Sequence, residues 1–335
     1  MGEYRNALMF QMLVPVIFST FVGGRGSQIG KLILGSMKWR IFQLLLLSAL
    51  LYPSCSQRPH IAETQLSGYD FSKPDKLVIL PEILHEVSGV TALDSATVLC
   101  IQDEKGIVFQ YNVIKDEIVH EYPFEMDGDF EGVALAGLTV FVLRSDGVLY
   151  EIADYTKPHS KVVSHETNIP SQNNEGLCYD AQANRLLIAC KSKPGKGPGF
   201  KDKRVIYAFD LDSKTLSAEP VFNFDLDVIR KFALENDVQI PTRQKKNDKA
   251  PQPIIKFKPS AIMIHPATNQ LYLLSASDHM LFVFDRKGTI EHIELLDQNI
   301  FNKSEGITFF SNGDALITNE GQEGKPTLLR FRYRK

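Results

Sequence analysis

The chain has 335 residues, of which 44% are hydrophobic and 23% are charged, which is the balance of a globular protein with a substantial core. Its 37 Lys and Arg against 40 Asp and Glu give a formal net charge of −3, which excludes the strong basic field that nucleic-acid binding requires. Basic residues between positions 243 and 249 lie in a polar segment and are interpreted as a solvated loop.

Residues 37–55 have the layout of a secretory signal that ends in a lipid-attachment cysteine. Lys38 and Arg40 form its positive end, and an apolar stretch leads to a small residue and Cys55. This order resembles a bacterial lipobox. We therefore expect an exported protein held in the bacterial cell envelope, periplasmic or at the outer membrane, by a lipid on Cys55 alone. Secretion without an anchor and a retained signal are the alternatives.

The segments on either side of this signal lack the pattern of a fold. Residues 1–36 are interpreted as an upstream extension that results from an over-long start, and the alternative is a transmembrane helix over residues 7–22, which is short for a span. Residues 56–74 are polar and without periodicity, so we expect them to form a tether between the anchor and the folded domain.

Five later segments begin alike, with Ser or Glu followed by Gly or Ala and then an apolar residue. Their spacings are 43, 44, 85 and 45 residues, and each is followed by a turn, a β-rich apolar run and a run with an aromatic residue. The five start positions are Ser88, Glu131, Glu175, Ser260 and Glu305. Short strands with a period of about 40–45 residues are typical of propeller blades. We therefore predict an all-β, five-bladed β-propeller over residues 75–335.

Insertions explain the 85-residue interval better than a sixth blade does. Residues 227–236 carry apolar side chains at helical spacing, and residues 242–253 are strongly polar, so we predict an insertion over 225–257. A second insertion, rich in Gly, Pro and Lys, is predicted over 192–203. Because the last repeat supplies only three strands, we predict that an N-terminal strand over 76–80 completes it and closes the ring.

Several of these segments carry a family resemblance. Residues 173–177, 258–262 and 303–307, together with 318–321, resemble the SdiA-regulated family of bacterial propeller proteins, and the resemblance runs from about residue 77 to the end. It implies a five-bladed propeller that is distantly NHL-like, a calcium site, and a cellular role that has not been defined.

Equivalent positions of the blades converge at one mouth, because the first strand of each blade lines the axis of a propeller. We expect the five start residues to line this mouth, and strand pairing within the blades to add Asp103, Arg144, Lys191, Asp278 and Glu320. Three glutamates in a narrow space repel one another, so they must be protonated, paired with cations or bridged by a metal. Arg144 and Lys191 are expected to pair with two of them, whereas Glu305 faces Glu320.

The oxygen-rich composition of the mouth favours Ca²⁺, which takes six to eight oxygen ligands. Zinc fits poorly, because no His or Cys occupies a mouth position. The predicted metal ligands are Glu131, Glu175, Glu305, Glu320, Asn174 and Asn319. The alternatives are that the Glu-Gly starts serve backbone geometry at the crowded axis, or that the carboxylates are catalytic.

Three functional hypotheses remain open at this point. The first is a calcium-binding envelope protein that recognises a small ligand or an envelope protein. The second is a calcium-dependent hydrolase of esters, lactones or phosphoesters. The third is a scaffold that docks partners on its insertions. The absence of a mouth histidine as a base favours binding over catalysis, and the sequence does not identify the ligand.

Overall fold

The computed structural model of the chain describes residues 66, 68–157, 160–244 and 250–334. The predicted signal over 37–55, Cys55 and the upstream extension lie outside the described residues. Within the described part, the model contains no helix with the length and hydropathy that a membrane span requires.

The strands form five antiparallel sheets that follow one another along the chain as blades 1 to 5. Blade 1 consists of β2 (Val87–Ala92), β3 (Thr97–Gln102), β4 (Lys105–Asn112) and β5 (Glu117–Asp127). Blade 2 consists of β6 (Phe130–Ala136), β7 (Thr139–Arg144), β8 (Val148–Ala153) and β9 (Lys161–Glu166). Blade 3 consists of β10 (Asn174–Asp180), β11 (Arg185–Cys190), β12 (Lys203–Asp210), β13 (Thr215–Leu216) and β14 (Phe222–Asp225), the last also paired with β12.

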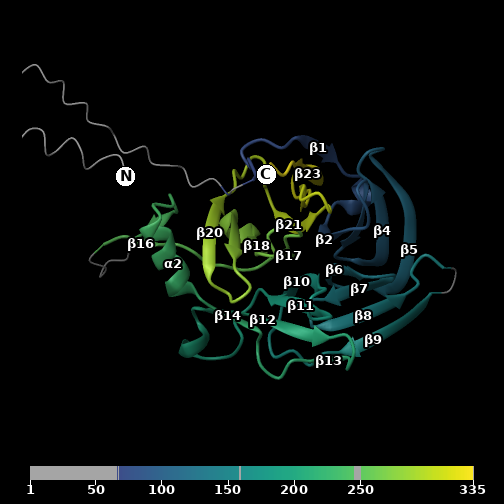
Figure 1. Cartoon of the computed structure of the whole chain (residues 1–335), viewed down its shortest axis with the longest axis horizontal. Helices are drawn as coiled ribbons and strands as arrows, with labels where there is room; N and C mark the ends of the chain where they lie inside the picture. The colour runs from purple at the N-terminus through teal and green to yellow at the C-terminus, as the bar shows by residue number, and fades with distance from the viewer. Residues whose placement is uncertain (1–65, 67, 158–159, 245–249, 335) are drawn as a thin grey trace, which may run out of the picture. The chain divides into compact units, whose positions relative to one another are not determined.

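Blade 4 consists of β17 (Ala261–Ile264), β18 (Leu271–Ser275), β19 (Met280–Phe284) and β20 (Ile290–Leu295). Blade 5 consists of β21 (Ser304–Phe309), β22 (Ala315–Asn319), β23 (Thr327–Phe331) and β1 (Lys76–Ile79). Short 3-10 helices lie at Glu82–Leu84 (η1), Pro198–Phe200 (η2) and Ala276–Asp278 (η3). The first strands touch in the cyclic order β2, β6, β10, β17, β21 and back to β2, and Figure 1 shows them nearest the centre. The prediction of a five-bladed β-propeller is therefore confirmed.

Burial explains the continuous apolar runs of the middle strands. All residues of β3 and β18 are buried, because each of these strands is covered on both faces by neighbouring blades. The outermost strands β5 and β9 have no buried residue and carry polar side chains toward solvent. The core is consequently divided into clusters that lie between consecutive blades, and no single blade buries both of its faces alone.

The ring is closed by the strand nearest the N-terminus, as the sequence predicts. β1 pairs antiparallel with β23, with Val78 opposite Leu328. Val78 is buried, whereas its neighbours Leu77 and Ile79 are exposed. β1 thus supplies the outer strand of blade 5 and covers an edge of β23 that would otherwise be open.

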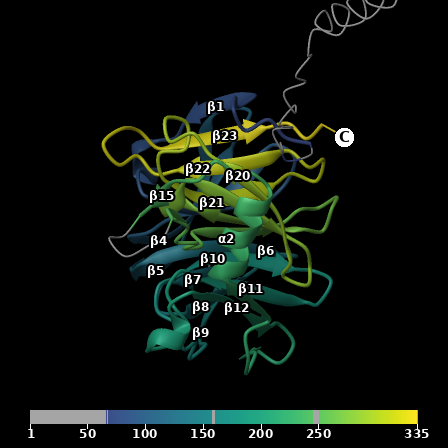
Figure 2. The same cartoon turned by 90° about the vertical axis from the view of Figure 1, so that its left-hand side faces the viewer.

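The larger insertion packs on the outer side of blades 3 and 4. Its helix α2 (Leu226–Glu235) begins at Asp225, whose carboxylate accepts a hydrogen bond from Asp227 N at 2.9 Å, and it buries Ile229 and Ala233. A two-stranded hairpin, β15 (Thr242–Arg243) and β16 (Gln252–Pro253), follows. Figure 2 looks onto the side of the propeller that carries α2.

The residues that precede β1 pack into the propeller. Leu66, Tyr69 and Phe71 are buried in the cluster between blades 4 and 5. The expectation of a tether over 56–74 is therefore wrong for the part of it that the structure describes. Three apolar side chains of that polar segment are buried between two blades.

Tyr69 is held by a buried histidine. His265 Nδ1 accepts hydrogen bonds from the backbone N–H groups of Ala267 and Thr268, so its Nε2 carries the hydrogen and faces the Tyr69 hydroxyl at 2.8 Å. The hydroxyl in turn donates to the carbonyl of Gly313. Burial lowers the pKa of His265 to about 4, which keeps the ring neutral at physiological pH.

Candidate axial site

A β-bulge marks the start of four of the five blades. The pairing register shifts between Val87 and Gly89 in blade 1, and equivalent shifts surround Glu131, Glu175 and Glu305. In blade 4 the same position is Ser260, whose backbone N–H donates to Leu274 O just before β17 begins. A bulged residue has no partner of its own across the ladder and its side chain is re-aimed. Here the bulged residues point toward the axis.

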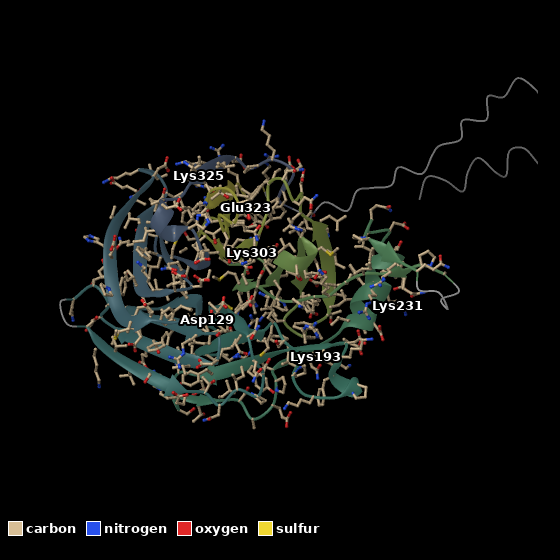
Figure 3. All side chains as sticks on the ribbon, turned by 180° about the vertical axis from the view of Figure 1, so that it is seen from behind. Asp129, Lys193, Lys231, Lys303, Glu323 and Lys325 are labelled. Carbon is tan, nitrogen blue, oxygen red and sulfur yellow. The ribbon has the colours of Figure 1, made fainter. Side chains whose placement is uncertain are left out.

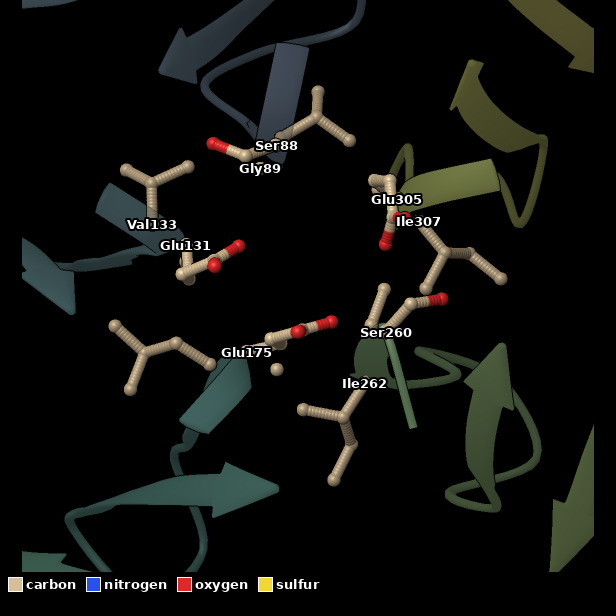
Figure 4. A pocket seen from close by; sticks show the side chains of 15 residues that line it. Ser88, Gly89, Glu131, Val133, Glu175, Ser260, Ile262, Glu305 and Ile307 are labelled. Carbon is tan, nitrogen blue, oxygen red and sulfur yellow. The ribbon is translucent and has the colours of Figure 1, made fainter. Parts of the chain in front are cut away.

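The five blade-start positions line one cavity on the axis. Each blade contributes three consecutive residues to its wall, and Figure 4 shows the carboxyl groups of Glu131, Glu175 and Glu305 directed inward, with Ser88 and Ser260 completing the ring. The cavity offers about 10 Å³ to the centre of a water molecule, which is room for about one water or one bare ion. The structure thus brings together all five residues that the repeat places at the mouth.

The residue after each bulge packs against the next blade. At Gly132, an added Cβ would lie 2.9 Å from the carbonyl oxygen of Glu175 and 2.7 Å from Cβ of Leu177. The two serines join neighbouring blades by donating hydrogen bonds, Ser88 to Phe130 O at 2.6 Å and Ser260 to Ser304 O at 2.8 Å. The small residues therefore draw the first strands together, and this closeness crowds the carboxylates.

Crowding and burial disfavour the charged form of the three glutamates. Burial, and after it the charges of Glu175, Asp129 and Glu305, raise the pKa of Glu131 to about 9. Burial, and next the charge of Glu305, raise the pKa of Glu175 to about 7. Burial also raises the pKa of Glu305. The cluster is an acidic site that gains from any added positive charge.

Two lysines supply part of that positive charge. Lys191 Nζ lies 2.5 Å from Glu175 Oε1, as the sequence predicts for this pair. Lys303 Nζ lies 3.6 Å from Glu305 Oε1 and 2.5 Å from Glu320 Oε2, so Glu305 and Glu320 do not face each other unpaired. Sequence reasoning missed Lys303, which lies just before β21 and two residues before Glu305. The bulge at Glu305 breaks the regular alternation of faces that could otherwise have indicated this lysine.

Two charged residues expected at the mouth, Arg144 and Asp278, form their contacts elsewhere. Arg144 pairs with Asp146 at 2.8 Å and donates to the Tyr150 hydroxyl, so it does not neutralise Glu131. Asp278 accepts hydrogen bonds from the backbone N–H groups of Lys256 and Phe257, which fasten the larger insertion to blade 4. Neither side chain lines the cavity. In blade 2 the bulge at Glu131 leaves Arg144 paired with Phe130 instead.

The two asparagines proposed as ligands also lie outside the cavity wall. Asn174 is buried and donates to the carbonyl groups of Ser145 and Ser171. Asn319 donates to Ile300 O and accepts from the Ser304 hydroxyl at 2.8 Å. Both amides therefore link neighbouring segments around the mouth. Asn174 directly precedes the bulged Glu175, and Asn319 is the cross-strand partner of Ser304.

A second acidic group lies at the rim between blades 5 and 1. Burial, followed by the charges of Glu86 and Glu320, raises the pKa of Asp103 to about 7. Glu320 connects this group to the axial cluster through its ion pair with Lys303. Asp103 and Glu320, both predicted at the mouth, thus interact electrostatically with each other, but neither lines the axial cavity.

The axial residues supply oxygen ligands but do not form a preorganised coordination sphere. Among the residues described, no group of three or more His, Cys, Asp and Glu side chains is arranged to hold a metal ion. Glu175 is only 4% exposed, and its Oε2 atom has no hydrogen-bond partner within the described part of the chain. A buried carboxylate oxygen without a partner costs free energy, and a bound cation would remove this cost for Glu175 Oε2.

Comparison with known proteins supports the propeller fold and does not indicate a function. No family model and no curated protein matches the chain. It is similar to the solved structure of glutaminyl cyclase from Myxococcus xanthus, with a TM-score of 0.50 and 13% identity over 78% of this chain and 95% of the other. Streptogramin B lyase matches with a TM-score of 0.44 and 10% identity over 77% of this chain and 97% of the other.

At these identities the similarity shows the fold alone, because propellers carry many unrelated functions. The chain is a five-bladed β-propeller with an acidic cluster on its axis.

Proposed function

We propose that this chain is an envelope-bound binding protein of the SdiA-regulated type, whose axial glutamates take up a divalent cation, Ca²⁺. Through the occupied mouth the propeller recognises a small ligand or an envelope protein. The single observation that carries the proposal is the meeting of Glu131, Glu175 and Glu305, from three different blades, in one cavity of ionic size.

The charge balance of the mouth supports a divalent ion. Four carboxylates, those of Glu131, Glu175, Glu305 and Glu320, are set against the two ammonium groups of Lys191 and Lys303. Full ionisation leaves a formal charge of −2, which one divalent cation neutralises. All-oxygen ligands favour Ca²⁺ over zinc, and the flexible glutamate side chains suit the variable geometry of Ca²⁺ better than the strict octahedron of Mg²⁺.

The lining of the cavity supports binding rather than hydrolysis. The cavity takes about one water or ion, and its wall of Glu, Ser, Gly and aliphatic residues contains no histidine to act as a base. When bound, the cation would supply positive charge that joins blades 2, 3 and 5 at the axis. Glu131, Glu175 and Glu305 would hold it, and Ser88 and Ser260 would keep the neighbouring strands in place.

The envelope location belongs to the same proposal and depends on Cys55. The signal-like order of residues 37–55 supports lipidation at that cysteine. Expression in a bacterial host with labelled palmitate tests it, since the wild type should be labelled and recovered with membranes, whereas Cys55→Ala should be unlabelled. An unlabelled wild type would contradict lipid anchoring and leave the cation site untouched.

A calcium titration followed by thermal unfolding tests the cation site. After treatment with EGTA, added CaCl₂ should raise the Tm of the wild type, because an ion that binds only the folded state stabilises it by mass action. Glu175→Gln and Glu305→Gln should each weaken the calcium midpoint by about tenfold or more, the scale expected when one charged ligand is lost.

Glu121→Gln is the matched control, because Glu121 is an exposed glutamate on β5. This variant should respond to calcium as the wild type does. A Tm that does not depend on calcium in the wild type, or equal responses in all four proteins, would overturn the proposed site.

A further inference from the structure

Lys191 already fills the role of a cation in the axial cluster. Its Nζ atom lies 2.5 Å from Glu175 Oε1. Burial of the Lys191 side chain opposes its charge, but Glu305, Glu175 and Glu131 together outweigh this effect and hold the pKa of the lysine above its ordinary value. Lys191 is therefore paired directly with one axial glutamate and lies in the electric field of the other two, a field that would also attract an incoming metal ion.

Lys191 and Lys303 differ in their carboxylate partners. Lys303 has a second carboxylate partner outside the cavity, Glu320 at 2.5 Å, and it approaches Glu305 only to 3.6 Å. Lys191 has no ion pair with any other described residue besides Glu175. Lys191 is consequently the cation whose removal changes the axial site most.

The position of Lys191 in the fold allows its side chain to leave. It follows the last residue of β11 and stands at the root of the insertion over 192–203, and its side chain is 28% exposed. The backbone of Lys191 stays fixed, because its N–H donates to Asn173 O at 2.9 Å. Rotation of one long side chain at a strand end would place the ammonium in water without moving a strand.

We propose that Lys191 is a displaceable internal cation, which occupies the axial carboxylates in the metal-free protein and swings toward solvent when a divalent cation enters. This inference rests on the proposed function and adds its regulation. The measured affinity for the metal is the intrinsic affinity of the carboxylates reduced by competition with the lysine.

The substitution Lys191→Met tests the competition, because it keeps the length of the side chain and removes its charge. Isothermal titration with CaCl₂ on the full chain, after EGTA treatment, should give a dissociation constant about tenfold or more lower than that of the wild type, as expected for removing a like charge next to the ion. Lys303→Met should produce a smaller decrease, because Lys303 is bound chiefly by Glu320.

Lys193→Met is the matched control. Lys193 is an exposed lysine two residues further along the same insertion, and in Figure 3 it lies out toward the rim whereas Lys303 lies near the centre of the ring. This variant makes the same change in net charge and should leave the dissociation constant unchanged. An equal tightening in Lys193→Met would mean that net charge alone is responsible and would overturn the inference.

The outcomes separate this inference from the proposed function. If wild type and Lys191→Met bind calcium equally, the lysine does not compete, and the cation site itself stands. If only Lys191→Met binds, the lysine is a permanent substitute for the metal that calcium does not displace, so both the proposed function and this inference fail for the wild type. If neither binds, both ideas fail. Should Lys191→Met not fold, Lys191→Gln replaces it with the same expectation, because the amide still donates a hydrogen bond to Glu175.

Discussion

The residue at the start of each blade gives the axial site its chemistry. Glu131, Glu175 and Glu305 are held close together by small residues that join adjacent strands, so their charges interact in a poorly solvated space. Their raised pKa values follow from this confinement. At the scale of single residues, the electrostatic repulsion among the three glutamates therefore depends on pH and on the cations present.

The metal-free protein should lose stability as the pH rises. A carboxyl group whose pKa is higher in the folded state binds its proton more tightly when folded, so its contribution is complete below the unfolded pKa near 4.5 and is lost as the pH passes through about 7 for Glu175 and about 9 for Glu131. Urea unfolding in EGTA between pH 5 and pH 9 measures this decline, with the range chosen to span the two pKa values.

Glu131→Gln should flatten the alkaline part of this profile, because the amide does not titrate. Glu121→Gln, on an exposed strand, serves as the control and should follow the wild type. A wild-type stability that stays constant over this pH range would contradict the crowding of charges at the axis.

A methyl group at the axis should be costly. Gly132→Ala places its Cβ against backbone and side-chain atoms of blade 3, so we expect the free energy of unfolding to fall by about 1–3 kcal/mol, the usual cost of overpacking. Gly199→Ala is the control, because no atom lies within 4 Å of the Cβ that it would add. Equal stabilities of the two variants in urea would show that the first strands are not in close contact.

The sequence predicts which residues meet at the axis better than it predicts their partners. Ser88, Glu131, Glu175, Ser260 and Glu305 can be found because they recur with the period of the blade. Simple pairing about each turn fails for Arg144, since the bulge displaces the register by one residue and the nearby Asp146 captures the guanidinium. A bulge leaves no mark in the hydrophobic pattern, so its effect on partners such as Lys303 is visible only in three dimensions.

Among the elements, the outer strand of blade 5 joins the two ends of the propeller. β1 belongs to the start of the chain and β23 to its end, and the burial of Val78 between blade 5 and blade 1 connects them. The closing strand could be predicted because the last repeat lacks a fourth apolar run. Closure of this kind removes the exposed edge of β23.

A charge on the buried side of β1 should weaken the pairing of β1 with β23. Val78→Asp is expected to lower the free energy of unfolding by about 2–4 kcal/mol, because it buries an unpaired carboxylate. Leu77→Asp, one residue away and exposed, should change it by no more than about 0.5 kcal/mol. Thermal or urea unfolding measures both, and a large effect of Leu77→Asp with a small effect of Val78→Asp would contradict the strand register.

The segment before β1 should stabilise the junction of blades 4 and 5. Tyr69→Phe removes the hydroxyl that joins His265 to Gly313 and leaves two buried polar groups without a partner, so we expect a loss of about 1–3 kcal/mol. Tyr179→Phe loses only a half-exposed hydrogen bond to Asn184 and should cost less than about 1 kcal/mol. Equal losses in urea unfolding would show that Tyr69 is not anchored.

This segment was not predictable as part of the fold. Leu66, Tyr69 and Phe71 are isolated in a polar stretch and follow neither strand nor helix spacing. Their burial depends on a groove between two blades whose walls are formed by residues some 200 positions later in the chain, such as Tyr272 and Phe301. Local patterns carry no information about such a groove.

For the whole molecule, the closed ring brings the repeated Glu-Gly, Ser-Gly and Ser-Ala blade starts together into a single site. The glutamates are more than 40 residues apart in sequence, and only a closed ring of blades directs them to one point. Composition and spacing predict insertions over 192–203 and 225–257. The first of them begins directly after Lys191, so this lysine connects the insertion in the chain with the axial glutamate Glu175, to which it is paired.

Long-wavelength anomalous diffraction from a crystal grown in CaCl₂ tests the central claim most directly. The account predicts a calcium peak on the propeller axis, with oxygens of Glu131, Glu175 and Glu305 at about 2.3–2.6 Å and the ammonium of Lys191 turned to solvent. An axis that holds only water, with Lys191 still paired to Glu175 at saturating calcium, would contradict it.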